Sequence, residues 1–412
     1  MASEGTSYGK YQMKTKVVWL APYPVLSLEP EIHIARRPLA EHPASWIVNL
    51  LNALAQRSDV ELHLVTESSR VACSQRARIG PITVHVVKIG IPFLNRGFPR
   101  WLPLDVLNGF RSNVVRLLKE VRAVEPDIVH AHGTEAAYAL TAVESRLPCL
   151  ISMQSVITDY FRTNPCLRFR IVRRYEQDSV RRARYFTCRT SFDTGFVRSL
   201  NPNARIFTIH EAMNPVYFQN EWRVCDVDRL LYVSELVLRK GLDVLLEALK
   251  EVLQTRPNTV LTVVGGGDQS RYRQLAKRLH IASKVEFLGF RSAGEIARLH
   301  LENQLFVLPS ANENSPNSLA EAMVSGLPVI STAVGGIPSM VEHGQSGWLV
   351  PPHDPAALAN AILQLLQHPE QRARLGQAAR QRARDRHLPE HVAAQTVEAY
   401  REILKFEATG RG

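Results

Sequence analysis

The stretch Pro309–Gly336, PSANENSPNSLAEAMVSGLPVISTAVGG, carries the strongest structural signal in the chain. The apolar run that ends just before it, Leu305–Leu308, is typical of a buried strand. A polar loop follows and carries Glu313, and Glu321 comes eight positions later on a predicted helix. Ser315–Pro316 fit the N-cap and the first position of that helix. The stretch therefore predicts a strand, a loop and a helix, with a carboxylate on each side of the helix start.

The start of this predicted helix is a candidate binding site for an anion. The amides of Asn317, Ser318 and Leu319 lie at the positive end of the helix dipole, where a phosphate would fit. Glu313 and Glu321 would repel a phosphate placed beside them, so we expect hydroxyl groups as their partners. A ligand with phosphate in the middle and hydroxyls at both ends is a nucleotide-sugar. Spacing alone also allows a second interpretation, in which the two glutamates lie on a solvated loop and a solvated helix face.

The same run resembles the E-x7-E motif of the retaining glycosyltransferases of family 4. The resemblance includes Glu-Ala-Met from Glu321 and Gly-x-Pro-Val from Gly326, and it extends more weakly over nearly the whole chain. It implies the GT-B fold and the transfer of a sugar from a nucleotide-diphospho-sugar, with no metal and no other cofactor. It also implies that Glu313 holds the hydroxyls of the donor sugar and Glu321 those of the ribose. Lys240 and the amides of residues 317–319 would then hold the diphosphate.

The bulk composition is that of a globular protein with more than one domain. The chain has 412 residues, 45% of them apolar and 22% charged, and a chain of this length is expected to divide into two domains. It has no apolar run near the roughly 20 residues that cross a bilayer, and its polar start lacks a signal-peptide core. The five scattered cysteines favour reduced thiols, and thus a cytoplasmic protein without a structural metal site.

The net charge of +11 is concentrated in Arg162–Arg189, where Phe161 and Phe169 lie among arginines. One interpretation is a surface that draws the protein to the anionic inner face of a membrane as a peripheral protein. The alternatives are a solvated basic helix and a surface for an acidic soluble acceptor. Nucleic acid is not a predicted partner, because no zinc finger, homeodomain or ribonucleoprotein motif accompanies the charge.

Short apolar runs alternate with helical stretches, and the pattern restarts near residue 229. The first series of predicted strands is Lys16–Ala21, Val60–Val65, Ile82–Ile89, Asp127–Ala131, Cys149–Met153, Tyr185–Cys188 and Arg205–Ile209. The second series is Arg229–Val233, Val260–Val264, Val285–Leu288, Leu305–Leu308, Pro328–Ser331 and Trp348–Val350. Such alternation predicts an α/β protein with two doubly wound, Rossmann-like domains facing each other across a cleft, the GT-B architecture that the resemblance implies.

The predicted domain boundaries follow from this pattern. They are 13–212 for an N-terminal acceptor-side domain, 213–228 for a linker, 229–385 for a C-terminal nucleotide-sugar-binding domain, and 386–412 for a C-terminal helix. In the family this last helix packs back on the first domain, and the resemblance implies the same here.

The second predicted domain opens with a loop whose cation can reach a diphosphate. Lys240 precedes a helix there, and a lysine at such a place neutralises phosphate as a point charge. The family usually has Gly-Arg earlier in this loop, whereas this chain has Ser234 and Glu235. The resemblance therefore implies Lys240 as a catalytic group. Because Arg239 lies beside Lys240 in the sequence, we expect it to supply the missing positive charge for donor binding. A plain surface lysine is the alternative.

Two further loops of this domain follow predicted strands. Gly265 begins a glycine run that lets a nucleotide approach closely, although the run is neither a dinucleotide fingerprint nor a P-loop. By resemblance, Phe290 and Arg291 belong to a loop that lies against the nucleotide base, mostly through its backbone.

In the first predicted domain, His130 and His132 end a strand and point to one face. Two histidines alone do not make a metal site. The resemblance implies that His132 reaches the donor sugar, and we assign His130 a structural hydrogen-bonding role. The loop and helix that contain His42 and Trp46 shape the acceptor pocket in the family, and Gln154 stands where a histidine is common.

The functional prediction is thus a retaining hexosyltransferase that acts on a glycan, a lipid-linked or a small-molecule acceptor in polysaccharide or glycoconjugate biosynthesis. An isomerase that resembles the nucleotide-sugar 2-epimerases is the first alternative, since those enzymes share the architecture. A non-catalytic, transferase-like protein is the second, because Glu235 replaces the arginine of the family.

Overall fold

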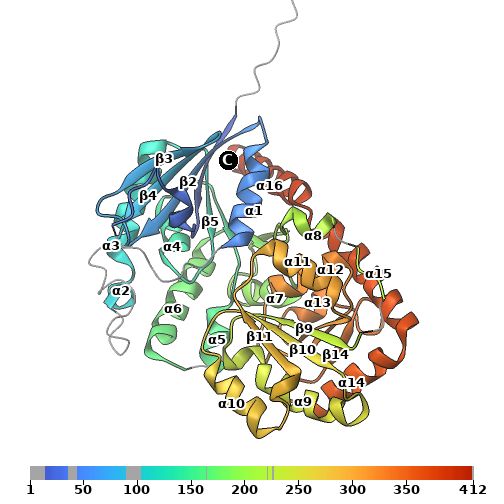
Figure 1. Cartoon of the computed structure of the whole chain (residues 1–412). Helices are drawn as coiled ribbons and strands as arrows, with labels where there is room; N and C mark the ends of the chain where they lie inside the picture. Colours follow the sequence, from blue (N-terminus) through green and yellow to red (C-terminus); the bar gives the residue numbers. More distant parts are fainter. Residues whose placement is uncertain are drawn as a thin grey trace, which may run out of the picture.

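The computed structural model of the protein describes residues 14–35, 44–89, 104–163, 165–219, 221–224 and 227–410. Within these ranges the strands form two sheets, and helices cover both faces of each (Figure 1). The predicted fold of two doubly wound α/β domains is confirmed. No helix in the described ranges is both long and apolar enough to cross a bilayer.

The sheet of the first domain has the strand order β3-β4-β2-β1-β5-β6-β7-β8. Its strands are β1 (Thr15–Leu20), β2 (Val60–Ser68), β3 (Gln75–Ile79), β4 (Ile82–Lys88), β5 (Ile128–His132), β6 (Cys149–Ser152), β7 (Tyr185–Cys188) and β8 (Arg205–Thr208). All neighbours pair in parallel except β3 and β4, which form an antiparallel edge. The sequence did not predict β3, because an edge strand with exposed residues has no continuous apolar run.

Helices pack on both faces of this sheet because its strands are apolar on both sides. Val17 and Trp19 of β1 face one core, whereas Val18 and Leu20 face the other. The helices of this domain are η1 (Val25–Leu28), α1 (Ser45–Ala55), α2 (Leu104–Leu107), α3 (Arg111–Val124), α4 (Ala137–Glu144), α5 (Ile157–Thr163), α6 (Leu167–Arg182) and α7 (Ser191–Leu200).

The second domain repeats this plan with a fully parallel sheet of order β11-β10-β9-β12-β13-β14. Its strands are β9 (Arg229–Val233), β10 (Val260–Val264), β11 (Val285–Gly289), β12 (Leu305–Leu308), β13 (Val329–Thr332) and β14 (Trp348–Val350). Its helices are α8 (Pro215–Gln219), η2 (Leu238–Lys240), α9 (Leu242–Thr255), α10 (Ser270–Arg278), η3 (Ala282–Lys284), α11 (Ala293–Glu302), α12 (Asn317–Ser325), α13 (Ile337–Met340), α14 (Pro355–Gln367) and α15 (Pro369–His387). Although α8 falls within the predicted linker, it packs on α11 and α12.

The last helix, α16 (Pro389–Thr409), returns from the second domain to the first. It lies beside α1 in Figure 1, and its apolar residues belong to the core that α1 shares with the first sheet. Tyr400 is fully buried there, and its hydroxyl lies 2.7 Å from Nδ1 of His130. His130 also contacts the hydroxyl of Ser152 through Nε2, at 2.6 Å. Both ring nitrogens of His130 therefore serve to hold the structure together.

The basic segment predicted as one surface is divided between surface and core. Arg189 is buried within the first domain, and Arg182 forms ion pairs with Glu144 and Asp178. The guanidinium of Arg173 covers the ring of Phe161, at 4.4 Å from its centroid. The prediction of one continuous basic surface from Arg162 to Arg189 was therefore wrong at its C-terminal end.

We expect the contact between Tyr400 and His130 to determine how firmly α16 is attached. Tyr400→Ala removes a buried ring and should lower the free energy of unfolding by about 3–5 kcal/mol. Tyr400→Phe removes the hydrogen bond alone and should cost about 1 kcal/mol. Urea denaturation followed by circular dichroism measures both. The exposed Glu398 on the same helix provides a control, Glu398→Ala, which should change stability by less than about 0.5 kcal/mol. Equal effects of all three substitutions would contradict the assignment.

Candidate functional site

The two domains meet through the loop that follows β12. Asn314 in this loop is buried, and its amide nitrogen donates a hydrogen bond to Asp193 of the first domain at 3.0 Å. Its side-chain oxygen accepts one from the hydroxyl of Thr190 at 2.7 Å. Asn312 also bonds to Asp159 of α5. The loop predicted to hold the donor is thus fixed against the other domain by its own side chains.

Close backbone contacts fix this loop on its other side. Gly335 has φ +51°, and a Cβ there would collide with the carbonyl oxygen of Glu313. The amide of Gly336 donates to that same carbonyl at 3.1 Å. The Gly-Gly pair at the end of the quoted stretch is therefore needed for the backbone of Glu313 to lie where it does.

Glu313 and Lys240, both predicted catalytic residues, form an ion pair. The two side chains are 5% and 13% exposed, and the hydroxyl of Ser310 donates a second hydrogen bond to Glu313 Oε1 at 2.9 Å. Charges so far from water are stable only when they are paired and hydrogen-bonded. The structure thus brings together a cation and a carboxylate that lie far apart in the sequence.

Arg239, the other predicted phosphate ligand, lies beside this pair. Its guanidinium stacks on the ring of Tyr160 in the first domain, at 5.2 Å from the centroid. Its Nη1 is buried and has no hydrogen-bond partner among the described residues. Arg239 and Glu235 also line a pocket of about 560 Å³ next to Asp268 and Arg271. A ligand with oxygen acceptors could satisfy the free Nη1.

The start of α12 differs from the prediction in two details. The helix begins at Asn317, Pro316 takes the N-cap position, and no side chain caps it, so the assignment of Ser315 as the N-cap was wrong. The amide of Leu319 bonds to the carbonyl of Pro316 at 3.2 Å, so it is not open to a phosphate as predicted. Within the described part of the chain, the amides of Asn317 and Ser318 have no acceptor. Two of the three predicted amides thus stay open at the helix start.

Glu321 is partly buried one turn into α12. It contacts the hydroxyl of Tyr217, a buried residue of α8. Burial raises the pKa of the Glu321 carboxyl to about 7, and the hydrogen bond from Tyr217 offsets only part of that effect. The interpretation of Glu321 as a solvated residue was wrong. A carboxyl in this setting gains when hydroxyl groups of a ligand approach it.

The remaining predicted donor residues lie in two loops of the second domain. Gly265 has φ +150°, and a Cβ on it would collide with the carbonyl of Ser234 in the neighbouring loop. Phe290 is 66% exposed. The Nη1 of Arg291 donates a hydrogen bond to the carbonyl of Phe290, and its Nε lies 3.6 Å from Oε1 of Glu295. Both loops follow the carboxyl ends of strands, where ligands of such sheets bind.

His132 lies in a buried charged cluster at the carboxyl edge of the first sheet. Its Nε2 is 3.6 Å from Oε1 of Glu211, and Arg189 Nη1 is 2.5 Å from the same oxygen. Burial acts to raise the pKa of Glu211, but Arg189 and His132 outweigh it and hold the pKa at about 2. Neither ring nitrogen of His132 has a hydrogen-bond partner among the described residues. His132 is therefore held beside a carboxylate and has hydrogen-bonding capacity for a ligand.

Arg189 connects this cluster to the loop that follows β12. Its Nη2 donates to the carbonyls of Met153 and Gln154, and Asn314 donates to that same Gln154 carbonyl at 3.3 Å. Roles in this site were not predicted from the sequence for Arg189, Glu211 and Asn314. Arg189 directly follows β7, and Glu211 comes shortly after the end of β8. Because ligands of such sheets bind at the carboxyl ends of the strands, these two positions could have been predicted as site residues.

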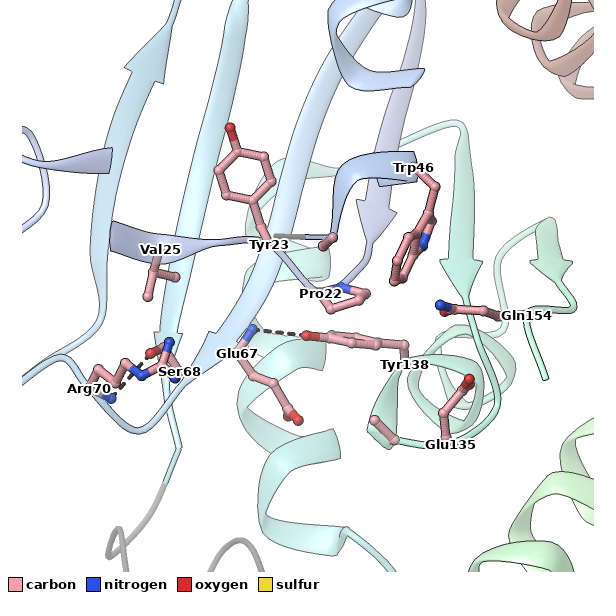
Figure 2. Close-up of a pocket in the computed structure, with 12 residues that line it drawn as sticks. Pro22, Tyr23, Val25, Trp46, Glu67, Ser68, Arg70, Glu135, Tyr138 and Gln154 are labelled. Atoms are coloured by element: carbon pink, nitrogen blue, oxygen red, sulfur yellow. Dashed lines mark hydrogen bonds between the residues drawn. The ribbon is translucent and has the colours of Figure 1, made fainter. Parts of the chain in front are cut away.

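The first domain has a pocket of about 400 Å³ at the same edge (Figure 2). Trp46 and Gln154, both predicted to bind the acceptor, line it. His42 lies outside the described residues. Glu67 and Glu135, which the sequence analysis did not single out, line the pocket as well. The structure thus places two of the predicted acceptor residues in one cavity.

Comparisons with known proteins agree with this architecture. Residues 44–216 match the family model of Glycosyltransferase Family 4, and residues 222–382 match that of the glycosyl transferases group 1. N-acetyl-alpha-D-glucosaminyl L-malate synthase of Bacillus anthracis is 29% identical over 222 residues, which are 52% of this chain and 58% of that protein. The chain thus matches less than two thirds of the length of this relative.

Two solved structures share the fold over almost the whole chain. Sucrose-phosphate synthase from Thermosynechococcus elongatus has a TM-score of 0.77 and 19% identity, and the match covers 96% of this chain and 100% of that one. HepE of Anabaena in complex with UDP-glucose has a TM-score of 0.67 and 18% identity, and covers 94% of this chain and 99% of that one. At these identities the likeness establishes the fold. Because the two family models match the two domains in turn, the chain belongs to the family 4, group 1 glycosyltransferases with the GT-B fold.

Proposed function

We propose that the protein is a retaining glycosyltransferase that moves a sugar from a nucleotide-diphospho-sugar to an acceptor hydroxyl in glycoconjugate biosynthesis. The observation that carries the proposal is the pairing of Lys240 with Glu313 near the start of α12. A cation and helix amides that lack acceptors can bind a diphosphate, and a nearby carboxylate can bind the hydroxyls of the attached sugar. HepE, which shares the fold, was solved with UDP-glucose, a donor of this class.

In this proposal the diphosphate lies between Lys240 and the amides of Asn317 and Ser318. The bond from the sugar carbon to the diphosphate oxygen breaks, and negative charge grows on the leaving group. Lys240, Arg239 and the helix dipole stabilise that charge. The acceptor oxygen attacks from the same face, and its proton passes to the departing diphosphate. No metal ion or other cofactor enters this scheme, which stays a prediction.

Carboxylates bind the hydroxyls at both ends of the donor in this proposal. Glu313 accepts hydrogen bonds from the transferred sugar, and Glu321 from the ribose, where Tyr217 holds its carboxyl in place. His132 approaches the sugar from the first domain. Phe290 and Arg291 offer a surface to the base. The acceptor, a glycan, a lipid-linked sugar or a small molecule, enters through the first domain.

Nucleotide-sugar turnover tests the proposal. The protein is incubated with UDP-glucose, UDP-N-acetylglucosamine or GDP-mannose, and thermal stability and released nucleotide diphosphate are measured. A donor that raises the melting temperature and is consumed supports transfer. A nucleotide-sugar changed at C2 without release of the diphosphate would establish the isomerase alternative, which the comparisons do not favour. Binding without turnover would support the non-catalytic alternative.

Lys240→Ala should lower kcat by at least about a hundredfold, because the cation acts most strongly on the departing diphosphate. Lys240→Arg retains the charge and should recover part of the rate. Arg239→Ala, which removes a cation stacked on Tyr160, should cost less than Lys240→Ala. Steady-state kinetics compares the variants, and circular dichroism checks their fold. A larger loss in Arg239→Ala would show that the diphosphate lies nearer Arg239.

The affinity for the donor should depend on the ionisation of Glu321. The free protein holds this carboxyl protonated below its pKa of about 7, and the ionised form accepts the ribose hydroxyls. The affinity for UDP-glucose should therefore rise about tenfold from pH 6 to pH 8. The diphosphate of UDP-glucose does not titrate in this range, so calorimetry reports on the protein. Glu321→Gln should bind more weakly and show a flat profile. A wild-type profile as flat as that of Glu321→Gln would refute the role.

We also propose that the exposed arginines of α6 attach the protein to anionic membranes. Arg170, Arg174 and Arg181 are exposed on this helix, and each cation near such a surface contributes about 1 kcal/mol. The protein should sediment with anionic vesicles at low salt and lose this binding at high salt. The double variant Arg170→Glu, Arg174→Glu should stay in the supernatant. Equal recovery of the wild type with anionic and neutral vesicles would exclude the membrane and leave a solvated basic face or an acidic soluble acceptor.

A further inference from the structure

Arg239 and Tyr160 meet across the boundary between the two domains. Arg239 belongs to η2 of the second domain, and Tyr160 belongs to α5 of the first, which lies next to the second domain in Figure 1. The guanidinium carbon of Arg239 is 5.2 Å from the centroid of the Tyr160 ring. Asn312 and Asp159 form a hydrogen bond at the same boundary. The first domain thus contacts a side chain that the proposed function assigns to the diphosphate.

The second domain fixes the backbone of Arg239. Its carbonyl accepts a hydrogen bond from the amide of Ala311 at 2.8 Å, which ties it to the loop after β12. Gly241, two residues further on, has φ +71°, and a Cβ there would collide with the carbonyl oxygen of Pro309. An arginine side chain on a fixed backbone still has many rotamers. The contact with the Tyr160 ring selects among them.

The first domain fixes the ring of Tyr160. Glu176 of α6 is fully buried and accepts hydrogen bonds from the backbone amides of Ile157 and Thr158 at the start of α5, each at 2.9 Å. The Tyr160 ring also packs near Phe169 of α6, with the two ring centroids 6.5 Å apart. Because these contacts tie α5 to α6, the ring is presented to the second domain from a rigid support.

The contact with the ring leaves hydrogen-bonding capacity on Arg239. A guanidinium over an aromatic ring is attracted by the ring face, and the N–H groups that point away from the ring stay available for oxygen acceptors. The Nη1 of Arg239 is buried and has no acceptor within the part of the chain that the structure describes. A buried donor without an acceptor costs free energy, and an oxygen of a bound ligand would remove that cost.

The charges nearby make an anion the expected partner of this Nη1. The stretch between β9 and α9 has three charged residues, Glu235, Arg239 and Lys240. Lys240 is already paired with Glu313, so much of its charge is compensated before a ligand arrives. The charges of Arg239 and Glu313 both act on the phenol of Tyr160, which places the ring near the carboxylate proposed to hold the donor sugar. A diphosphate beside that sugar would therefore meet Arg239.

We propose that Tyr160 is a positioning residue for donor binding, whose ring holds the guanidinium of Arg239 across the domain boundary with Nη1 directed to the diphosphate. The inference rests on the proposed function and deepens it, since it assigns a residue of the first domain to the diphosphate subsite of the second. A guanidinium held in one orientation loses less conformational entropy when it binds phosphate, so the ring raises the affinity. Tyr160 thus acts through Arg239 and not by contact with the donor.

Calorimetry on the full chain tests this inference without any need for turnover. The probes are inorganic pyrophosphate, UDP, GDP and ADP, together with the nucleoside of whichever diphosphate binds most tightly. Tyr160→Leu removes the ring and should weaken the binding of pyrophosphate and of that diphosphate by about tenfold, but not the binding of the nucleoside. Tyr160→Phe keeps the ring and should stay within about threefold of the wild type.

Phe207→Leu provides a matched control. It removes an aromatic ring from another arginine, since the guanidinium carbon of Arg205 lies 5.8 Å from the centroid of the Phe207 ring on the edge strand β8. This variant should leave the affinities for pyrophosphate and for the nucleoside diphosphate unchanged.

A double-mutant cycle separates positioning from a purely structural contact. Arg239→Ala alone should weaken pyrophosphate binding by about tenfold. In that background Tyr160→Leu should add less than about a twofold loss, because no guanidinium is left for the ring to hold. Melting curves show whether each variant is folded. If Tyr160→Leu does not fold, Arg239→Lys provides the second measurement: it keeps the charge but not the planar guanidinium, and it should also bind pyrophosphate several-fold more weakly.

The outcomes separate this inference from the proposed function. Unchanged pyrophosphate binding in folded Tyr160→Leu, wild-type binding in Arg239→Lys, or full and independent losses in the double-mutant cycle overturn the inference, even if a nucleotide-sugar is turned over. Ring-dependent binding of pyrophosphate by a protein that turns over no nucleotide-sugar would instead support the diphosphate subsite and contradict the proposed transfer. A wild-type protein that binds none of the diphosphates would contradict both.

Discussion

A buried ion pair between Arg189 and Glu211 holds the centre of this molecule together. Its two charges are hidden from water, and such a pair is stable only because further polar groups complete it. Arg189 also donates to the carbonyls that follow β6, and the backbone carbonyl of Glu211 contacts His387 at the end of α15 at 2.8 Å. The pair therefore joins the carboxyl edge of the first sheet to the helix that brings the chain back from the second domain. His132, placed beside Glu211, depends on the same arrangement.

The interface between the domains is built from this centre outward. Asn314 forms hydrogen bonds with Asp193, Thr190 and the carbonyl of Gln154. Thr190 follows Arg189 in the sequence, and Arg189 itself donates hydrogen bonds to Asp193 and to the Gln154 carbonyl. Because Asn314 directly follows Glu313, any change in the spacing of the domains also moves the carboxylate that pairs with Lys240. The position of the proposed donor site is thus coupled to the packing of the first domain, although Lys240 and Glu313 belong to the second.

The sequence predicted the features that depend on local pattern. Strands such as β9 and β10 were located correctly because their apolar runs are buried on both faces. The antiparallel β3 was missed, since an edge strand lacks that run. Lys240 and Glu313 were each selected, but their pairing joins residues 73 positions apart and follows only from the tertiary fold. Glu135 was not selected, because nothing in its neighbourhood distinguishes it from a surface glutamate before β5 and β6 are placed side by side.

The distribution of charge follows from the kinds of groups that the cleft is proposed to bind. The chain carries a net charge of +11, yet the carboxylates of Glu313 and Glu321 lie among the described residues that face the proposed donor. A cleft that binds only phosphate groups would be lined mainly by cations. Here a few positive groups, Lys240, Arg239 and the start of α12, are confined to the place proposed for the diphosphate. Carboxylates beside these cations accept hydrogen bonds from hydroxyl groups, so the proposed donor site can distinguish the sugar and the ribose from the diphosphate.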